Sequence, residues 1–131
     1  MSIKFKEIYN NSIKEPEKFW EEVSKDIFWY KKPSKILNKS NPPFYKWFED
    51  GTTNTSYNAL DFHIQNGLGD KIALIYDSPI TGKKSKFTFS NLKEKVAKFA
   101  WALQNQGVNK GDRVIIYMPM IPEAVMTMLA C

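Results

Sequence analysis

The pattern of apolar and polar positions divides the chain into an irregular first part, residues 1–56, and a regular second part, residues 57–131. In the second part, apolar runs of strand length alternate with stretches in which apolar residues recur every three or four positions. Strand and helix in alternation predict the opening of an α/β domain of the doubly wound type. Because this chain supplies few strands, we expect an incomplete mixed or parallel sheet with its helices.

A short helix, a hairpin and a long helix are predicted at the start of the second part. Asn58 is the expected N-cap of the short helix, which carries Leu60 and Ile64 and ends at Gly67. Residues 71–76 form the first predicted strand, residues 77–82 the turn and residues 87–89 the returning strand. Ser90 is then expected to cap the long helix, which Gly107 ends. Its predicted buried face consists of Leu92, Val96, Phe99, Ala100 and Leu103.

The chain closes with a further predicted strand and a further predicted helix. Residues 113–118 are apolar after Arg113, as expected of a strand covered on both faces of a parallel sheet. Pro122 suits a first helical position, and Glu123 adds a negative charge to the positive first turn. The helix then reaches Cys131 without a Gly, Asn or basic residue that would end it. We therefore expect the chain to be the front portion of a larger protein.

The sequence of the first part, residues 1–56, predicts short helices followed by loops. Phe5, Ile8 and Tyr9 share one helical face, and Ser12 with Glu15 matches a capping box. Pro16 is expected to open a second helix. Its apolar stripe contains Phe19, Trp20, Val23 and Ile27. Several prolines after it favour extended backbone: Pro33, Pro42 and Pro43.

Large aromatic residues are unusually frequent in this irregular part. They include Trp20, Trp29 and Trp47, together with Phe28, Tyr30, Phe44, Tyr45 and Phe48. Because such side chains need a surface to cover, we expect the segment to wrap a neighbouring domain. A peptide-binding or sugar-stacking surface is the alternative interpretation.

Composition and charge indicate which partners and which kinds of site to expect. The net charge is +5, but every basic residue except Arg113 is a Lys, and the lysines are scattered among glutamates. This favours a solvated surface over nucleic-acid binding, which usually uses clustered Arg. One His and one Cys allow neither a zinc site nor an internal disulfide. No stretch reaches the roughly 20 apolar residues of a membrane span. We expect a cytoplasmic protein with no nucleic-acid or membrane partner.

The sequence contains no phosphate-binding loop, dinucleotide fingerprint, serine nucleophile motif or metal-ligand cluster. His63 is expected to be structural, bonded to a backbone group or an acid. Glu49 and Asp50, which precede Gly51, are expected to form a turn, and Glu123 to act as a helix-capping acid. From these residues we assign no catalytic, cofactor-binding or metal-binding residue to this chain.

Three segments together resemble the AMP-forming acyl-CoA synthetases, in their acetyl- and propionyl-CoA synthetase branch. The first is residues 47–63, with WFEDG followed by Asn54 and YNALDFH. The second is residues 70–76 (DKIALIY), and the third and most specific is residues 107–131, which include GDRVIIYMPMIPEA. Phe62 stands where the family usually has Arg, so a contact of that helix is expected to differ. Residues 76–82 look more like the propionyl-CoA than the acetyl-CoA synthetases.

The resemblance implies an acid–thiol ligase that works in two steps. A short carboxylate, propionate or acetate, would attack ATP in the presence of Mg²⁺ to give an acyl-adenylate, and CoA would then displace AMP. The family's catalytic and nucleotide-binding groups lie later in its sequence, so none is carried over. Residues 1–56 would be the family's N-terminal extension, and residues 57–131 the truncated start of its AMP-binding domain.

Two functional hypotheses remain open on this sequence. In the first, the chain is part of a ligase, is inactive alone, and has the missing C-terminal remainder as its partner. In the second, it is a non-catalytic interaction module that docks on a separately encoded remainder of the ligase. An unrelated α/β protein with accidental similarity is a third, weaker alternative.

Overall fold

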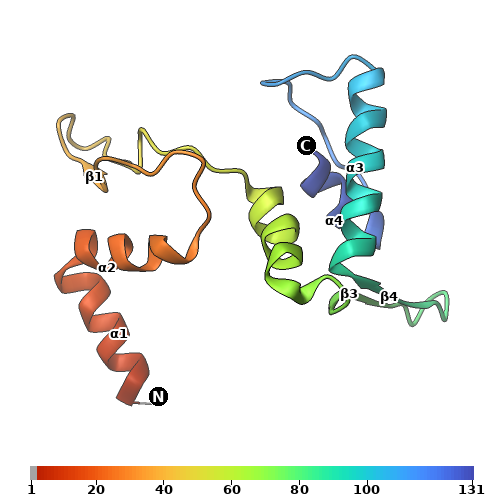
Figure 1. Cartoon of the computed structure of the whole chain (residues 1–131), viewed down its shortest axis with the longest axis horizontal. Helices are drawn as coiled ribbons and strands as arrows, with labels where there is room; N and C mark the ends of the chain where they lie inside the picture. The colour runs from red at the N-terminus through yellow and green to blue at the C-terminus, as the bar shows by residue number, and fades with distance from the viewer. Residues whose placement is uncertain (1–2) are drawn as a thin grey trace. The chain divides into compact units, whose positions relative to one another are not determined.

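The computed structural model describes residues 3–131, which fold as two compact units (Figure 1). The first unit extends to Asn54, and the second comprises Thr55–Cys131. Each unit is described by itself below. No described helix is long and apolar enough to cross a membrane.

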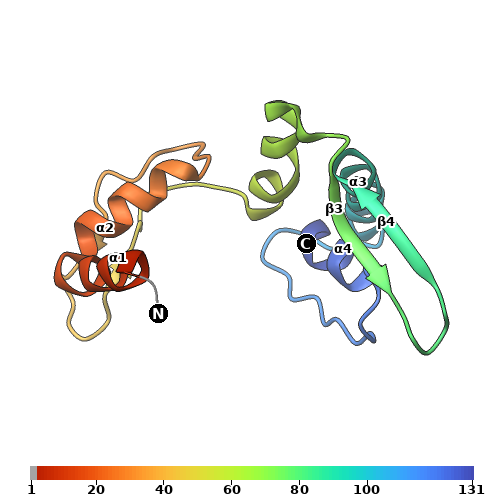
Figure 2. The ribbon, with the colours of Figure 1, turned by 90° about the horizontal axis from the view of Figure 1, so that it is seen from below.

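The first unit consists of two helices (Figure 2) and a loop region that contains a pair of short strands. Its helices are α1 (Ile3–Lys14) and α2 (Pro16–Val23), and a 3₁₀ turn, η1 (Ser24–Asp26), follows α2. Strand β1 (Leu37–Asn38) pairs antiparallel with β2 (Lys46–Trp47). A single bridge between Lys31 and Thr52 joins the beginning and end of the loop region.

The helices of the first unit were predicted, but two of their details were wrong. Ser12 and Glu15 form no capping box, because α1 continues through Ser12 to Lys14. The Ser12 hydroxyl instead donates to the Tyr9 carbonyl at 2.8 Å, inside the helix. Pro16 does open α2, but Ile27 lies beyond it in extended backbone and so leaves the predicted stripe.

The aromatic residues of this unit pack largely on one another. Trp20 and Trp47 have ring centroids 6.5 Å apart, and Trp29 lies 5.6 Å from Phe48. The Trp29 indole N–H also donates to the Ser24 carbonyl at 2.9 Å, which fixes the ring. Other aromatic side chains, such as Phe44, remain exposed. That they wrap a neighbouring domain stays a prediction.

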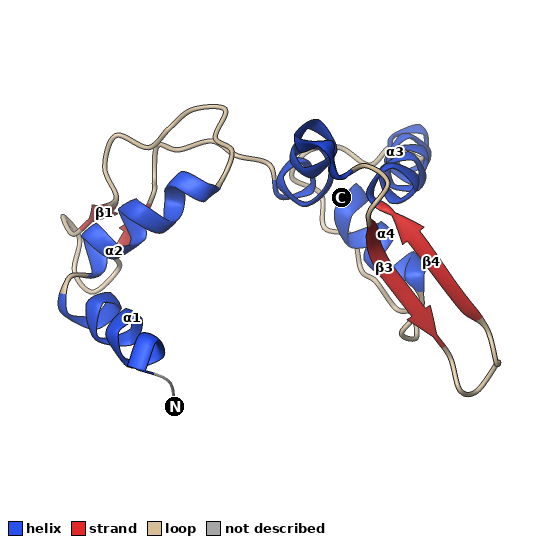
Figure 3. Ribbon diagram, turned by 60° about the horizontal axis from the view of Figure 1, so that its bottom comes forward, coloured by secondary structure: helices blue, strands red, loops and turns tan. Residues whose placement is uncertain are grey.

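The second unit packs helices against a β-hairpin (Figure 3). It opens with a helical segment that contains two wide, π-helical stretches, η2 (Tyr57–Asp61) and η3 (Ile64–Leu68). Asn58 lies inside this segment rather than at its cap, so that prediction was wrong. Gly67 lies at a kink inside η3, with a φ of 78° that favours glycine, and the segment ends at Leu68, one residue later than predicted.

The predicted hairpin is present and leads into the long helix. Strand β3 (Ile72–Asp77) pairs antiparallel with β4 (Lys84–Thr88), with an irregularity between Ile72 and Leu74. Helix α3 (Phe89–Asn105) follows immediately. Its N-cap is Thr88, whose hydroxyl accepts the Asn91 backbone N–H at 3.2 Å; the prediction of Ser90 was two residues late.

The core of the second unit lies where three helical elements meet. Leu60 from η2, Leu92 and Val96 from α3, and Met126 from α4 (Pro122–Ala130) form its buried cluster. Leu60 is only 2% exposed. The hairpin covers this cluster with Leu74 and Phe87, which are partly buried. The helix–hairpin–helix order agrees with the predicted α/β class.

Residues 113–118 differ from the sequence prediction. They form no strand, and the strand pairs of residues 3–131 are both antiparallel hairpins. Ile115 and Tyr117 are 91% and 99% exposed. The expected cover on both faces is therefore missing within the described chain, although Pro122 and Glu123 begin α4 as predicted.

Candidate functional site

The signature at residues 47–51 forms a tight turn. The Gly51 backbone N–H donates to the Phe48 carbonyl at 2.9 Å, and Phe48 has a φ of 51°, which is unusual for a residue with a side chain. A Cβ on Gly51 would lie 2.7 Å from Cζ3 of Trp29. The turn therefore needs glycine for close packing against an aromatic ring.

Both carboxylates of this turn are bound to neighbouring groups. Glu49 accepts from Lys46 Nζ at 2.6 Å and from Asn38 Nδ2 at 2.7 Å. Asp50 accepts the Ser34 backbone N–H at 2.9 Å, and Lys31 lies 3.8 Å away. The predicted turn is confirmed. Its two carboxylates also connect it to the loop region of the first unit through these contacts.

Hydrogen bonding to the ionised form lowers the pKa of both groups. The Lys46 ammonium, followed by the Asn38 amide, lowers the pKa of Glu49. The Ser34 side chain and backbone lower the pKa of Asp50. Carboxylates held in this way are charged near neutral pH and have their acceptor oxygens occupied. They suit a structural role better than proton transfer.

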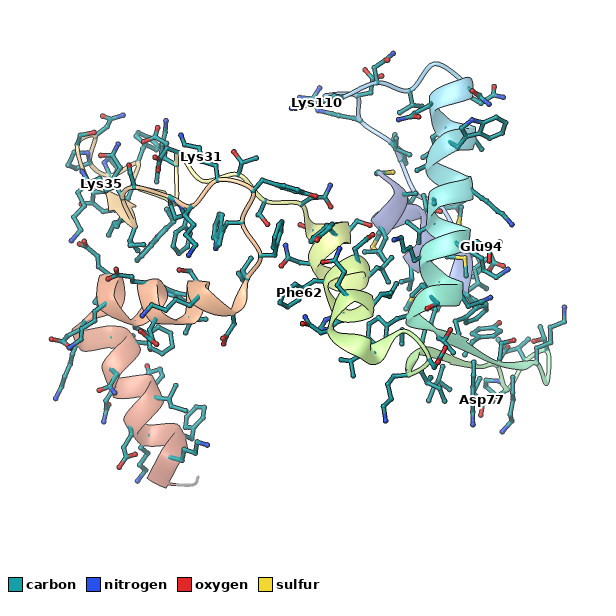
Figure 4. The ribbon with its side chains drawn as sticks, in the orientation of Figure 1. Lys31, Lys35, Phe62, Asp77, Glu94 and Lys110 are labelled. Carbon is teal, nitrogen blue, oxygen red and sulfur yellow. The ribbon has the colours of Figure 1, made fainter. Side chains whose placement is uncertain are left out.

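His63 lies in the helical segment of the second unit and packs on aromatic rings. Its ring centroid is 5.0 Å from that of Phe89 and 6.0 Å from that of Phe62. Phe62, the position where the family usually has Arg, is half-buried on the same segment (Figure 4). The neighbouring Asp61 pairs instead with Lys93 of α3 at 2.6 Å. These contacts connect the helical segment to α3.

An apolar hollow of the second unit lies between α3 and α4. It has a volume of about 480 Å³, and its lining includes Phe99, Ala102, Met118 and Met126. Three charged residues also line it, Lys95, Lys98 and Glu123. Lys98 is already paired with Glu94 at 2.6 Å and lowers the pKa of that carboxyl. Such a lining offers apolar contact and few fixed polar groups.

Residues 3–131 bring together no group of three or more His, Cys, Asp or Glu side chains suited to hold a metal ion. The glycines with positive φ lie apart along the chain, at Gly67, Gly82, Gly107 and Gly111. That this chain carries no catalytic, cofactor-binding or metal-binding residue stays a prediction.

Comparison with known proteins places both units in one family. Residues 5–59 match the family model described as the acetyl-coenzyme A synthetase N-terminus, and residues 62–131 match the model described as AMP-binding enzyme. The chain is 50% identical over 127 residues to a protein of Mus musculus named acyl-CoA synthetase short-chain family member 3, mitochondrial. It is 49% identical over 113 residues to acetyl-coenzyme A synthetase of Streptomyces coelicolor.

A solved structure has the same backbone arrangement over most of this chain. Acetoacetyl-CoA synthetase from Streptomyces lividans superposes with a TM-score of 0.78 and 31% identity, over 92% of this chain and 19% of that one. The two curated relatives are matched over 97% and 86% of this chain, but over only 19% and 17% of their own lengths. The match to the AMP-binding enzyme model covers more than half of the sequence, so the chain belongs to the AMP-binding enzyme family, in its acyl-CoA synthetase branch.

Proposed function

We propose that this chain is the N-terminal part of a short-chain acyl-CoA synthetase that forms an acyl-adenylate and transfers the acyl group to CoA. The observation that carries the proposal is the 50% identity to a short-chain acyl-CoA synthetase over 97% of the chain. In this proposal residues 1–56 are the N-terminal extension. Residues 57–131 open the AMP-binding domain, and the protein is cytoplasmic.

The proposed reaction has two displacements. An oxygen of the carboxylate attacks the α-phosphorus of ATP, and pyrophosphate leaves. The sulfur of CoA then attacks the acyl carbon, and AMP leaves. Mg²⁺ would neutralise phosphate charge during the first displacement. We assign none of its ligands to this chain, because residues 3–131 contain no suitable carboxylate cluster.

The role of this chain is then to build the framework that positions groups supplied elsewhere in the ligase. The buried contacts of Leu60, Leu92 and Met126 fix the helical segment against α3 and α4. We propose propionate as the preferred acid, with acetate second, on the basis of the loop at residues 76–82. The relatives named short-chain acyl-CoA synthetase and acetyl-coenzyme A synthetase are both compatible with this choice.

The test is an ATP–pyrophosphate exchange assay on the product of the full reading frame that contains these residues. Exchange that depends on propionate, with acetate weaker and a long-chain acid inert, is the expected result. The 131-residue chain alone, assayed as the matched control, is expected to give no exchange. Robust exchange by the short chain, or none by the full product with any short acid, would overturn the proposal.

If the remainder is encoded separately, the same assay identifies the interaction-module alternative. Each polypeptide would be inactive alone, and mixing them at micromolar concentration would produce exchange. The exposed apolar residues Ile115 and Tyr117 are the observation that favours keeping this second candidate.

A further inference from the structure

The helical segment of the second unit is kinked at Asn66 and Gly67. Asn66 has a φ of −86° and a ψ of 18°, and Gly67 has a φ of 78° and a ψ of 14°, so neither is helical. Both residues are exposed, and a Cβ at Gly67 would meet no atom within 4 Å. The stretch around them, η3, contains no buried residue. Opening this end of the segment therefore costs little packing, as in the parts of a fold that open most readily.

The order of the two residues matters chemically. Asn66 is the one asparagine of the sequence that a glycine follows. The backbone nitrogen of the next residue is the nucleophile nearest to the side-chain amide of an asparagine. Glycine leaves that nitrogen unshielded and lets the backbone rotate widely, because it has no side chain. The kink therefore combines an electrophilic amide carbon with an accessible nucleophile.

In the folded state a hydrogen bond keeps the two groups apart. Nδ2 of Asn66 donates to the Phe62 carbonyl at 2.8 Å. At a ψ of 18° the Gly67 nitrogen nearly eclipses the backbone nitrogen of Asn66 and points away from its side chain. A reaction between them requires release of the Phe62 contact and rotation about the Cα–C bond of Asn66. Its rate should follow how often this end of the segment opens.

We propose that Asn66 is a site of spontaneous deamidation, which converts it to aspartate and isoaspartate. The Gly67 nitrogen loses its proton to a solvent base and attacks Cγ of Asn66. The Cγ–Nδ2 bond breaks, and Nδ2 takes a proton and leaves as ammonia. Water then opens the resulting succinimide ring: attack at Cγ gives aspartate, and attack at the backbone carbonyl carbon gives isoaspartate. One water is consumed, one ammonia is released, and nothing is oxidised or reduced.

The product cannot keep the contact that the asparagine makes. An ionised carboxylate has no proton to donate, so one of its oxygens would face the Phe62 carbonyl oxygen in place of Nδ2. Its negative charge also lies in the last turn of the segment, where the helix dipole is negative. Isoaspartate in addition lengthens the backbone by one carbon at the kink. We therefore expect deamidation to loosen this end of the segment as the protein ages.

The Asp50–Gly51 pair supplies a contrast within the same chain. An aspartate before a glycine can close the same ring. Here, however, Asp50 accepts the Ser34 backbone N–H at 2.9 Å, and Gly51 is packed against the Trp29 ring. An ionised carboxylate is a poor electrophile, and the packed glycine has no room to rotate. We expect isoaspartate at residue 66 and none at residue 50.

The test is peptide mapping by mass spectrometry after the full reading-frame product has been incubated at mildly alkaline pH. Asn109 is the matched control, because it is exposed, its Nδ2 donates to the Gly107 carbonyl at 2.7 Å, and Lys110 follows it. Conversion should be at least about tenfold faster at residue 66 than at residue 109. It should also accelerate as the pH rises, because the nucleophile is the deprotonated nitrogen.

Two results would overturn the proposal. One is equal conversion at residues 66 and 109. The other is an unchanged Asn66 in the protein after a synthetic peptide of residues 62–70 has converted completely, because the kink would then be locked. Neither readout depends on catalysis, so the result stands whether or not the product shows ATP–pyrophosphate exchange.

The loosening is measured separately, by amide hydrogen exchange in two variants of the same product. Asn66→Asp should speed exchange across residues 64–69 by about fivefold or more, as the loss of one hydrogen bond does. Asn109→Asp, which adds the same charge elsewhere, should leave these amides unchanged. Equal exchange in residues 64–69 of Asn66→Asp and the wild type would show that the modification has no effect on the segment.

Discussion

At the scale of single residues, the close packing around Gly51 predicts the effect of a substitution there. A Cβ there would meet the Trp29 ring at 2.7 Å and the Phe48 carbonyl at 3.2 Å. The ring cannot easily retreat, because its N–H is bonded to the Ser24 carbonyl. Gly51→Ala should therefore destabilise the first unit by about 1–3 kcal/mol, as overpacking does. Urea unfolding followed by tryptophan fluorescence measures this, and an unchanged midpoint would contradict the packing.

The lowered pKa of Glu49 predicts how the stability of the first unit changes as the pH falls. Its hydrogen bonds lower its pKa from the ordinary 4.5, so the folded state binds its proton less readily than the unfolded state. Its contribution to stability is present above pH 4.5 and is lost as the pH falls through the lowered value. The stability difference between wild type and Glu49→Gln should therefore be constant at neutral pH and shrink below 4.5. Urea midpoints measured from pH 7 to pH 3 test this, and a difference that grows in acid would show the opposite linkage.

At the scale of elements, the sequence prediction and the structure differ in the N-cap residue of α3. Thr88, rather than Ser90, accepts the Asn91 N–H. Thr88→Ala should cost about 1 kcal/mol, the usual value of an N-cap. Ser90→Ala should cost much less, because Ser90 is held through its backbone N–H, which donates to the Gly69 carbonyl at 3.0 Å. Denaturation followed by circular dichroism decides between them, and a larger loss for Ser90→Ala would restore the original assignment.

Several elements were predictable because their signals are local. Pro16 and Pro122 begin helices, and the apolar period of α3 identified Leu92 and Val96 as buried. The N-caps were less predictable, since Thr88 and Ser90 are both good capping residues and only the length of β4 decides between them. The capping box failed because α1 runs through Ser12.

The segment at residues 113–118 shows why a strand cannot be predicted from composition alone. Its sequence has the apolar content of a buried strand, but a strand exists only when a neighbour completes its hydrogen bonds. The candidate site shows the same limit. The turn at Glu49 and Asp50 was predicted, yet its partners Asn38, Ser34 and Trp29 come from distant parts of the chain. No pattern in the neighbouring sequence predicts these partners.

At the scale of the whole molecule, the described chain exposes more surface than its mass requires. Its accessible area is 10483 Å². Two separate compact domains with the same total mass would expose roughly 8,500 Å². Part of the excess is apolar and lies close together in sequence, at Ile115, Tyr117 and Met120. Apolar surface in such a row is what proteins cover with another element.

This excess predicts how the 131-residue chain behaves when it is studied alone. It should have low solubility and strongly enhance the fluorescence of a dye that binds apolar patches. A longer product that covers Ile115 and Tyr117 should bind less dye per molecule. Replacing both Ile115 and Tyr117 by Lys in the short chain should remove much of the enhancement. Ile80→Lys, which changes an isolated exposed residue, should remove little. A monomeric short chain that melts in one sharp transition and binds no dye would show instead that this surface needs no cover.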